Sequence, residues 1–356
     1  MVFCLCLLVS TLCAQKNKNR EKKANNMVLP AFFRTPEYGY SYGVSGTSSF
    51  KTTHAHDSAT RTSLIQLLGF FTTRKVNAQG INASIFFPKE KNILLLQVNH
   101  IFFPDKFWGL GSNARSSDLC NYTYETIYFT PHLKHKIAKN FYLGVIMAYE
   151  HVYRIIYTAG STFDTIAFKG KHPYEVFAPG ISLTYDTRNN SFWPDKGLFV
   201  SAQYLHFQKK LFSDFTFDKN IIDIRYFKRV HANRILAFNL YAFQTFGNTP
   251  LRDLATLGGN SNIRGIYAGR YRALKALSFI TEYRFGIYKR FKGVIFGGFG
   301  NIFNTYAELN LQKNKYNIGA GLRFAFMKKE NLHLRFDYGY SSRENNAFYI
   351  TIGESF

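Results

Sequence analysis

The sequence feature that most constrains this chain is a strict alternation of apolar and polar residues, which recurs along most of its length. In the clearest segment, Leu277 and Phe279 fall on one side of an extended chain, and Glu282 and Arg284 on the other. Successive side chains of a strand point to opposite faces, so the segment predicts a strand with one apolar and one charged face. The apolar face is the core of a soluble sheet or the lipid-facing side of a membrane barrel.

Composition favours the barrel. The chain has 37 phenylalanines and 24 tyrosines but no apolar run long enough for a membrane-spanning helix. A barrel suits this balance, because only every second strand residue faces lipid. The net charge of +23 would by itself suggest nucleic acid, but the basic residues are spread over turns and polar faces, without a basic helix or zinc-ligand spacing. We therefore expect anionic lipid as their surroundings and no nucleic-acid partner.

The first residues read as a targeting segment. Residues 1–14 are apolar and precede the basic run Lys16 to Lys23, which predicts a secretory signal peptide cleaved after Ala14. Three of the four cysteines lie in this segment, so only Cys120 would remain, and neither a disulfide framework nor a cysteine metal site is expected. We expect residues 15–27 to be a disordered periplasmic lead-in and residues 28–356 to form the barrel.

From residue 28 onward, alternating segments of about ten residues are separated by turn-forming residues, as expected for tilted membrane strands. We predict an all-β fold, a transmembrane antiparallel β-barrel of about sixteen strands, an even number that suits antiparallel closure. The predicted strands span residues 28–34, 38–50, 62–73, 79–87, 93–103, 122–133, 141–157, 176–188, 198–207, 221–228, 235–246, 274–285, 292–301, 316–326, 332–341 and 347–356.

The lengths of the connections predict an orientation. Most even-to-odd connections are short, and the long odd-to-even connections follow Phe103, Tyr157, Phe246 and Asn301. Bacterial barrels place short turns in the periplasm and long loops outside. We therefore expect the loop after Phe246 to start on the extracellular side.

Two motifs carry a family resemblance. The loop before the strand at 274–285 contains Gly258-Gly259 and then Asn262-Ile263-Arg264-Gly265-Ile266, and that strand ends in Glu282-Tyr283-Arg284-Phe285. Elsewhere, Tyr185-Asp186-Thr187-Arg188 precedes Pro194-Asp195-Lys196-Gly197 across a turn. Together they resemble the outer-membrane assembly barrels typified by BamA and TamA, also called the bacterial surface antigen family. The resemblance covers nearly all of residues 28–356.

The resemblance implies a long extracellular loop folded into the barrel lumen, with its tip, Arg264 and Gly265, held by acidic residues of the inner wall. Alternation directs Glu282 and Asp337 inward, so they are the candidate anchoring acids. Further inward charges are expected in a wet or paired lumen. These are the basic cluster Arg284, Arg323 and Arg335, and the neighbouring pair Asp223 and Arg225.

One strand departs from the family pattern. The strand after Glu282 usually carries Phe-x-Asp-x-Gly, but here it reads Phe296-Gly297-Gly298-Phe299-Gly300, with glycine in place of the acid. The loop tip is then left to Glu282 or Asp337. The next strand keeps the family's glycine-rich pattern in Gly319-Ala320-Gly321-Leu322-Arg323, although close strand packing or barrel curvature accounts for such glycines equally well.

The last predicted strand resembles the C-terminal signal by which outer-membrane barrels reach their assembly machinery. Phe348, Ile350, Ile352 and Phe356 are expected on one apolar face, interrupted near its end by Glu354.

Nothing in the sequence predicts an enzyme. The polar residues with catalytic potential lie on different predicted elements, with no motif around them. They are His54, His56, Asp57 and His151. We expect no catalytic residues, no cofactor and no metal.

The resemblance implies a monomeric barrel in the outer membrane of a Gram-negative bacterium, surrounded by outer-membrane lipid. Such a barrel would take part in protein insertion or translocation, using a weak seam between the first and last strands and binding a substrate or periplasmic partner protein. We expect no POTRA module, because residues 15–27 are too few for one, and recruitment of a substrate is then unexplained. The alternative is a passive pore or structural barrel plugged by its own loop.

Overall fold

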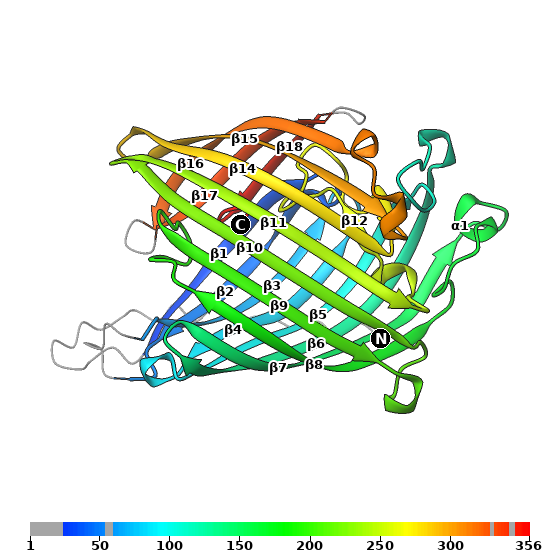
Figure 1. Ribbon diagram of the computed structural model, residues 1–356, viewed down its shortest axis with the longest axis horizontal. Coiled ribbons are helices and arrows are strands. Elements are labelled where there is room, and N and C mark those ends of the chain that lie inside the picture. The colour runs from blue at the N-terminus through cyan, green and yellow to red at the C-terminus, as the bar shows by residue number, and fades with distance from the viewer. Residues whose placement is uncertain (1–23, 54–59, 328–330, 342–345) are drawn as a thin grey trace.

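The computed structural model describes residues 24–53, 60–327, 331–341 and 346–356. These residues form a closed antiparallel barrel of sixteen strands, which confirms the predicted fold class (Figure 1). The predicted signal peptide and the run Lys16 to Lys23 lie outside the described residues, as do His54, His56 and Asp57. Within the described part of the chain, no helix is both long and apolar enough to cross a membrane.

The barrel strands lie next to one another in chain order, except that β11 pairs with β14 and β18 closes on β1. They are β1 (Ala24–Thr35), β2 (Gly39–Phe50), β3 (Ser63–Thr72), β4 (Asn77–Phe86), β5 (Asn92–Phe107), β6 (Cys120–Ala138), β7 (Phe141–Tyr157), β8 (Tyr174–Asp186), β9 (Gly197–Phe207), β10 (Phe217–His231), β11 (Arg234–Gly247), β14 (Lys275–Tyr288), β15 (Phe291–Phe303), β16 (Lys315–Met327), β17 (Leu332–Ser341) and β18 (Ala347–Ile352).

The connections add only short elements to the described part of the chain. A two-stranded ribbon, β12 (Ala255–Leu257) with β13 (Tyr271–Ala273), lies within the connection from β11 to β14. The remaining elements are single helical turns: η1 (Pro88–Glu90), η2 (Ser116–Asp118), α1 (Thr162–Thr165), η3 (Lys209–Leu211), η4 (Leu251–Asp253), η5 (Tyr306–Glu308) and η6 (Leu311–Lys313).

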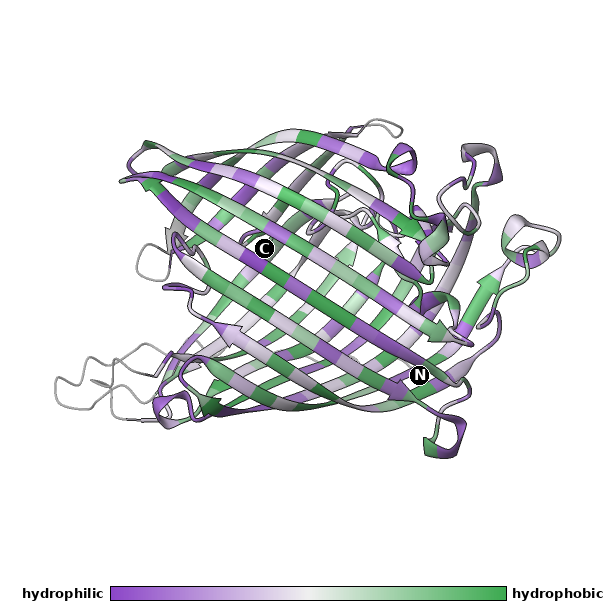
Figure 2. Cartoon of the chain, viewed as in Figure 1, coloured by the Kyte–Doolittle hydropathy of each residue, from purple (hydrophilic) through white to green (hydrophobic). Residues whose placement is uncertain are grey.

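The alternation predicted from the sequence is present in the barrel wall, as the banding along each strand in Figure 2 shows. On β8, Ile181 and Leu183 point outward and are 59% and 46% exposed, whereas Ser182 and Thr184 point inward and are buried. An apolar outer surface around a polar interior is typical of a membrane barrel.

All sixteen predicted strands are present, and most end within a few residues of their predicted limits. The first begins at Ala24 rather than at residue 28, so residues 24–27 belong to the barrel and not to the lead-in. The last ends at Ile352 rather than at Phe356, because the backbone turns at Gly353 with φ of +85°. The ribbon of β12 and β13 was not predicted.

The two ends of the barrel differ. The long-loop end, on the right in Figure 1, carries the connections β5–β6, β7–β8, β11–β14 and β15–β16, and the short-turn end carries β6–β7, β8–β9, β10–β11 and β14–β15. Aromatic side chains fill the barrel towards the long-loop end, where Phe107, Tyr122 and Phe163 are buried against one another. A second apolar cluster packs the β11–β14 connection, through Leu257 and Ile263, against Ile280 of the wall.

Candidate functional site

The luminal loop, residues 248–274, connects β11 to β14 and contains the ribbon strand β12 (Figure 1). Its contacts with β14 and β17 place Arg264 against the inner wall of the barrel. Arg264 is fully buried, with Nη2 2.5 Å from Glu282 Oε1 on β14 and Nη1 2.6 Å from Asp337 Oδ2 on β17. Its guanidinium carbon lies 3.4 Å from the ring centroid of Phe296 on β15. One side chain of the loop therefore contacts three strands through charge and cation–π interactions.

Contacts of the loop backbone extend this attachment to the two strands that the Arg264 side chain does not reach. The Gly265 amide donates to the hydroxyl of Tyr349 on β18 at 3.0 Å, and Asn317 Nδ2 on β16 donates to the Arg264 carbonyl at 2.9 Å. Gly265 has φ of +104°, a conformation that favours glycine over every other residue. The loop tip thus contacts β14, β15, β16, β17 and β18.

The two acids that bind Arg264 also bind arginines of the wall. Arg284 Nη2 lies 2.8 Å from Glu282, and Arg323 Nη1 lies 2.5 Å from Asp337. Arg335 lies 3.6 Å from Asp337. Buried charges are tolerated only when they are paired, so removing one group leaves its neighbours uncompensated.

Glu354 adds a third carboxylate, 2.7 Å from Arg323 Nε and 3.2 Å from His333 Nδ1. Burial would raise the pKa of this carboxyl, but the Arg323 guanidinium and the neighbouring His333 ring lower it to about 2. We refer to all of these ionised groups as the luminal charge cluster: Arg264, Glu282, Arg284, Arg323, Arg335, Asp337 and Glu354.

The structure therefore places the loop-tip arginine, the two candidate acids and the three arginines of the predicted basic cluster in one network. Arg264 contacts both candidate acids rather than one of them. On β15, where the family pattern has its acid, Phe296 supplies a ring face to Arg264 instead. The inward pair Asp223 and Arg225 lies apart from the cluster, with its own ion pair of 2.5 Å and a hydrogen bond from Asn239 to Asp223.

The C-terminal residues differ from the prediction. Phe348 and Ile352 point outward on β18 as expected, and Ile350 lies on the same face, but Phe356 is buried inside the barrel. The left-handed backbone at Gly353 ends the strand and reverses the direction of the residues after it.

Phe356 then packs beside Phe227, and its carbonyl accepts a hydrogen bond of 3.3 Å from Arg284. For the same reason Glu354 does not interrupt the outer apolar face, and Ser355 donates a hydrogen bond of 2.7 Å to Glu282. The residues after β18 therefore contribute to the luminal charge cluster.

A second polar cluster, at the long-loop end, was not predicted. Asp105 on β5 accepts hydrogen bonds from Tyr122 at 2.9 Å, from Tyr267 of the luminal loop at 3.1 Å and from Arg272 on β13 at 3.0 Å. Tyr267 and Arg272 lie more than 160 residues after Asp105, so no local pattern indicates the contact. The one available signal was an isolated acid within the aromatic stretch of residues 101–108.

The turn between β1 and β2 also reaches the luminal loop. Glu37 accepts a hydrogen bond of 2.6 Å from the amide of Ala268. Burial raises the pKa of the Glu37 carboxyl, and the hydrogen bond from Ala268 opposes this effect.

At the short-turn end, the β8–β9 turn carries the second family motif. Asp186 and Arg188 form an ion pair of 2.9 Å, and Thr187 Oγ1 accepts a hydrogen bond of 2.8 Å from the Leu198 amide. These contacts fold the motif back onto its own turn. The turn then directs the buried ring of Trp193 towards the lumen, where the Arg284 guanidinium lies 5.1 Å from that ring.

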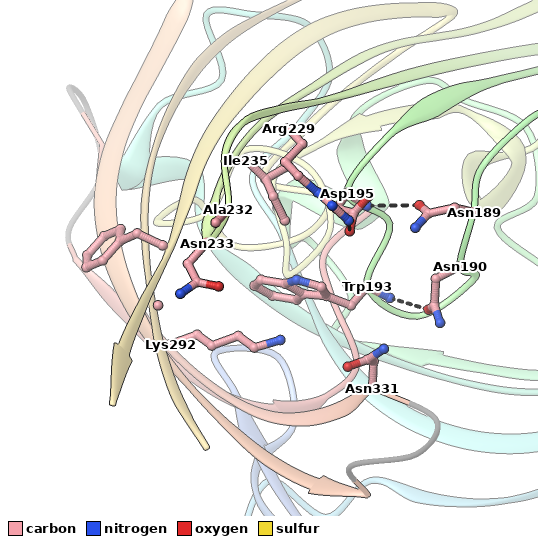
Figure 3. Close-up of a pocket in the computed structure, with 12 residues that line it drawn as sticks. Asn189, Asn190, Trp193, Asp195, Arg229, Ala232, Asn233, Ile235, Lys292 and Asn331 are labelled. Atoms are coloured by element: carbon pink, nitrogen blue, oxygen red, sulfur yellow. Dashed lines mark hydrogen bonds and ion pairs between the residues drawn. The ribbon is translucent and has the colours of Figure 1, made fainter. Parts of the chain in front are cut away.

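A cavity of about 440 Å³ opens beside Trp193 (Figure 3). Lys292 points inward from β15, with Nζ 4.2 Å from the Trp193 ring, and Arg229 forms an ion pair with Asp195. The remaining lining residues are mostly amides and apolar groups, including Asn190, Asn233, Asn331, Ile235 and Phe285.

His151, considered from the sequence as a catalytic candidate, lies on β7 with its ring edge-on to Tyr153. Among the residues that the structure describes, no three His, Cys, Asp or Glu side chains are grouped as metal ligands.

Comparisons with known proteins agree with this architecture. The family model for the Omp85 superfamily domain matches residues 66–356. No curated protein sequence matches the chain. Similar solved structures include BamA from Haemophilus ducreyi lacking POTRA domains 1–3, with a TM-score of 0.59 at 12% identity, covering 92% of this chain and 70% of that one.

Two structures of CdiB are also similar. CdiB from Acinetobacter baumannii gives a TM-score of 0.60 at 12% identity, covering 94% of this chain and 60% of that one. CdiB from Escherichia coli gives 0.63 at 10% identity, covering 94% and 63%. At these identities the similarity shows the fold, and this chain spans less than two thirds of either CdiB chain.

Proposed function

This chain belongs to the Omp85 superfamily, and from that membership we propose that it is an outer-membrane barrel that takes part in protein insertion or translocation. In this proposal the short-turn end faces the periplasm and the long-loop end faces outward. The barrel works as a monomer in outer-membrane lipid and binds a substrate or periplasmic partner protein. A crosslinking probe in the turn from Asn189 to Lys196 would capture a periplasmic partner.

The observation that carries the proposal is the seam between β1 and β18. In the described residues, these strands are partnered at one position, Arg34 with Ile350. By contrast, β1 is in register with β2 from Ala24–Phe50 to Thr35–Gly39, along its whole length. The neighbouring pair β17–β18 is in register from Leu334–Ile352 to Gly339–Ala347.

A strand with one unpaired edge presents a row of N–H and C=O groups to another chain. An incoming strand adds to such an edge through main-chain hydrogen bonds, which are largely independent of its side chains. Over most of its length, β1 is paired with β2 on one side and with no described strand on the other. Its free edge can therefore pair with incoming strands of many different sequences. This is the chemistry that insertion of other barrels requires.

The seam is closed at one end by the Arg34 side chain. Its Nη1 donates a hydrogen bond of 2.6 Å to the carbonyl of Phe348, and its guanidinium lies over the rings of Tyr40 and Phe348. A single side chain with one partnered backbone position is a small barrier to separation of the strands.

A disulfide across the seam tests the proposal. In a Cys120→Ala background, Arg34→Cys with Ile350→Cys would join β1 to β18, because these residues are partners on the outer face. The matched control joins β17 to β18 through Phe336→Cys with Ile350→Cys. Both are expressed in cells depleted of the unmodified chain, and folded outer-membrane barrels are followed by their heat-modifiable mobility.

We expect depletion to lower the amount of folded barrels, the control to restore it, and the seam disulfide to restore it only after reduction. Full restoration by the oxidised seam variant would refute a role for the seam. If depletion leaves other barrels and exported proteins unchanged, the assembly role itself is wrong.

The second candidate function is a passive pore or structural barrel plugged by its own loop. The luminal charge cluster favours it, because Arg264 is fully buried and bound on two strands at once. Here we expect Arg264→Ala to raise the conductance of the purified barrel in planar bilayers, with no partner recovered by crosslinking. The exposed loop variant Arg115→Ala is the control.

A further inference from the structure

Two neighbouring turns at the short-turn end are unusually basic. Residues 228–234, at the β10–β11 turn, and residues 286–292, at the β14–β15 turn, contain no Asp or Glu. They lie side by side, because β11 pairs with β14 and the Gly286 amide donates a hydrogen bond of 3.0 Å to the Asn233 carbonyl. Their basic residues, apart from a histidine, are Lys228, Arg229, Arg234, Lys289, Arg290 and Lys292.

Two of these cations line the cavity beside Trp193 that is described above. Arg229 forms its ion pair with Asp195, and Lys292 points inward at Trp193. The other four are the basic patch: Lys228, Arg234, Lys289 and Arg290. All four side chains are exposed. In the described part of the chain, none of them forms an ion pair with an acid.

The basic patch lies on the outer side of the wall. Lys228 shares the outward face of β10 with Tyr226, and Arg234 is partnered with Phe285, which faces outward on β14. Exposed apolar side chains continue to the tip of the second turn at Ile287, Tyr288 and Phe291. The cations are therefore interleaved with apolar groups at one edge of the outer apolar belt.

We propose that the basic patch binds the phosphate groups of anionic glycerophospholipids in the periplasmic leaflet of the membrane. Long basic side chains lay their alkyl stems along apolar surface and hold their charges at the headgroup level, where aromatic side chains also gather. Clustered Lys and Arg at that level attract anionic lipids. A soluble acidic partner fits less well, because the same face presents apolar side chains suited to acyl chains.

The opposite end of the barrel also carries exposed basic pairs, Arg74 with Lys75 and Lys209 with Lys210, but they lie on the separate β3–β4 and β9–β10 connections and do not form one patch. Its connections 158–173 and 304–314 each contain an acid, Asp164 and Glu308, among their basic residues. The choice of leaflet rests on the proposed function, because that proposal puts the short-turn end in the periplasm. The binding itself depends only on the geometry of the two turns.

The test measures lipid binding to the purified, folded chain in neutral detergent by native mass spectrometry, with phosphatidylglycerol or phosphatidylcholine as the probe. The variant Lys228→Gln, Arg234→Gln, Lys289→Gln and Arg290→Gln removes the basic patch. The control Arg74→Gln, Lys75→Gln, Lys209→Gln and Lys210→Gln removes the same charge from exposed sites at the long-loop end. Heat-modifiable mobility establishes that each variant is folded.

We expect phosphatidylglycerol to bind the unmodified chain and the control alike, and the patch variant roughly tenfold or more weakly. Added salt should weaken the binding, because the interaction is electrostatic. Should the patch variant fail to fold, the turn variant Lys289→Gln with Arg290→Gln should show a partial loss.

If the patch and control variants lose phosphatidylglycerol binding equally, overall charge explains the binding and the proposal is overturned. If the unmodified chain binds phosphatidylcholine as well as phosphatidylglycerol, recognition of the anionic headgroup is excluded. Patch-dependent binding of lipid A without phosphatidylglycerol would overturn the assignment to phospholipid. Because the assay needs no assembly activity, a failed depletion experiment would leave its result standing.

Discussion

The backbone of Gly339 on β17 lies against that of Gly265 at the tip of the luminal loop. A Cβ atom on Gly339 would lie 3.0 Å from the Gly265 nitrogen, and a Cβ on Gly265 would lie 3.1 Å from the carbonyl carbon of Gly339. A methyl group on Gly339, 2.8 Å from the Arg264 carbonyl carbon, would require the backbone to shift, and one on Gly265 would be tightly packed in a backbone conformation that favours glycine. The two glycines therefore set how closely the loop approaches the wall, and with it the reach of Arg264 to its acids.

We expect Gly339→Ala to push the loop tip away from β17 and to lower the free energy of unfolding by about 1–3 kcal/mol, the usual cost of overpacking. Urea unfolding in detergent would measure the loss, and limited proteolysis should cleave the luminal loop faster. Gly69→Ala is the control, because its Cβ would meet no atom within 4 Å. Equal effects of the two changes would contradict the close approach.

Replacing Arg264 by Met removes a buried cation from two buried acids. We expect a loss of about 3–5 kcal/mol in the free energy of unfolding, because Glu282 and Asp337 lose a partner without gaining water. A double-mutant cycle of Arg264→Met with Glu282→Gln should be non-additive, because the two side chains form an ion pair of 2.5 Å. A strictly additive cycle would mean that the ion pairs are not coupled.

The pH dependence of stability should include a contribution from Glu354. Its folded-state pKa of about 2 lies below the usual value of 4.5, so its ionised form stabilises the folded barrel above about pH 4.5. That stabilisation, up to about 3 kcal/mol, is lost as the pH falls from about 4.5 towards 2. Thermal unfolding in detergent across this range would measure it.

In the same experiment Glu354→Gln should flatten the acid limb of the stability curve. Glu308→Gln, at an exposed loop, should leave it unchanged. An unchanged acid limb in the Glu354 variant would show that the carboxyl is not held ionised by Arg323 and His333.

Arg34→Ala should loosen the seam without unfolding the barrel. Its side chain bridges to Phe348 beside the partnered position of β1 and β18, so its removal should speed hydrogen exchange of the β18 amides. Exchange in β6 and β7 should stay unchanged. Arg154→Ala, an exposed arginine on β7 that pairs with Glu125, is the control. Uniform acceleration throughout the barrel would instead indicate global destabilisation.

The strands could be predicted from the sequence because their signal is local. An alternation such as that of Ile181 to Thr184 needs no knowledge of distant residues, and it also fixes which side chains face the lumen. This inward direction was enough to select Glu282 and Asp337 as neighbours of a luminal loop. It could not predict that Arg264 would contact both, because that depends on the position of the loop tip.

The rest depended on backbone conformation or on distant contacts. A single left-handed residue, Gly353, turned Glu354 and Phe356 from the outer face to the lumen, and the period-two pattern carries no sign of such a turn. Asp105 meets Tyr267 and Arg272 only because the luminal loop returns to the long-loop end. Long loops are placed by tertiary contacts, which alternation does not encode.

The attachment of the loop tip makes the two borders of the seam mechanically unequal. On one border, Arg264 and Gly265 contact five consecutive strands, β14 to β18, and hold this C-terminal panel of the wall rigid. On the other, β1 is in register along its whole length with β2 only, and in place of the loop tip there is a hydrogen bond from the Ala268 amide to Glu37 in the β1–β2 turn. Widening of the seam would therefore swing the β1–β2 hairpin outward while the C-terminal panel keeps its shape.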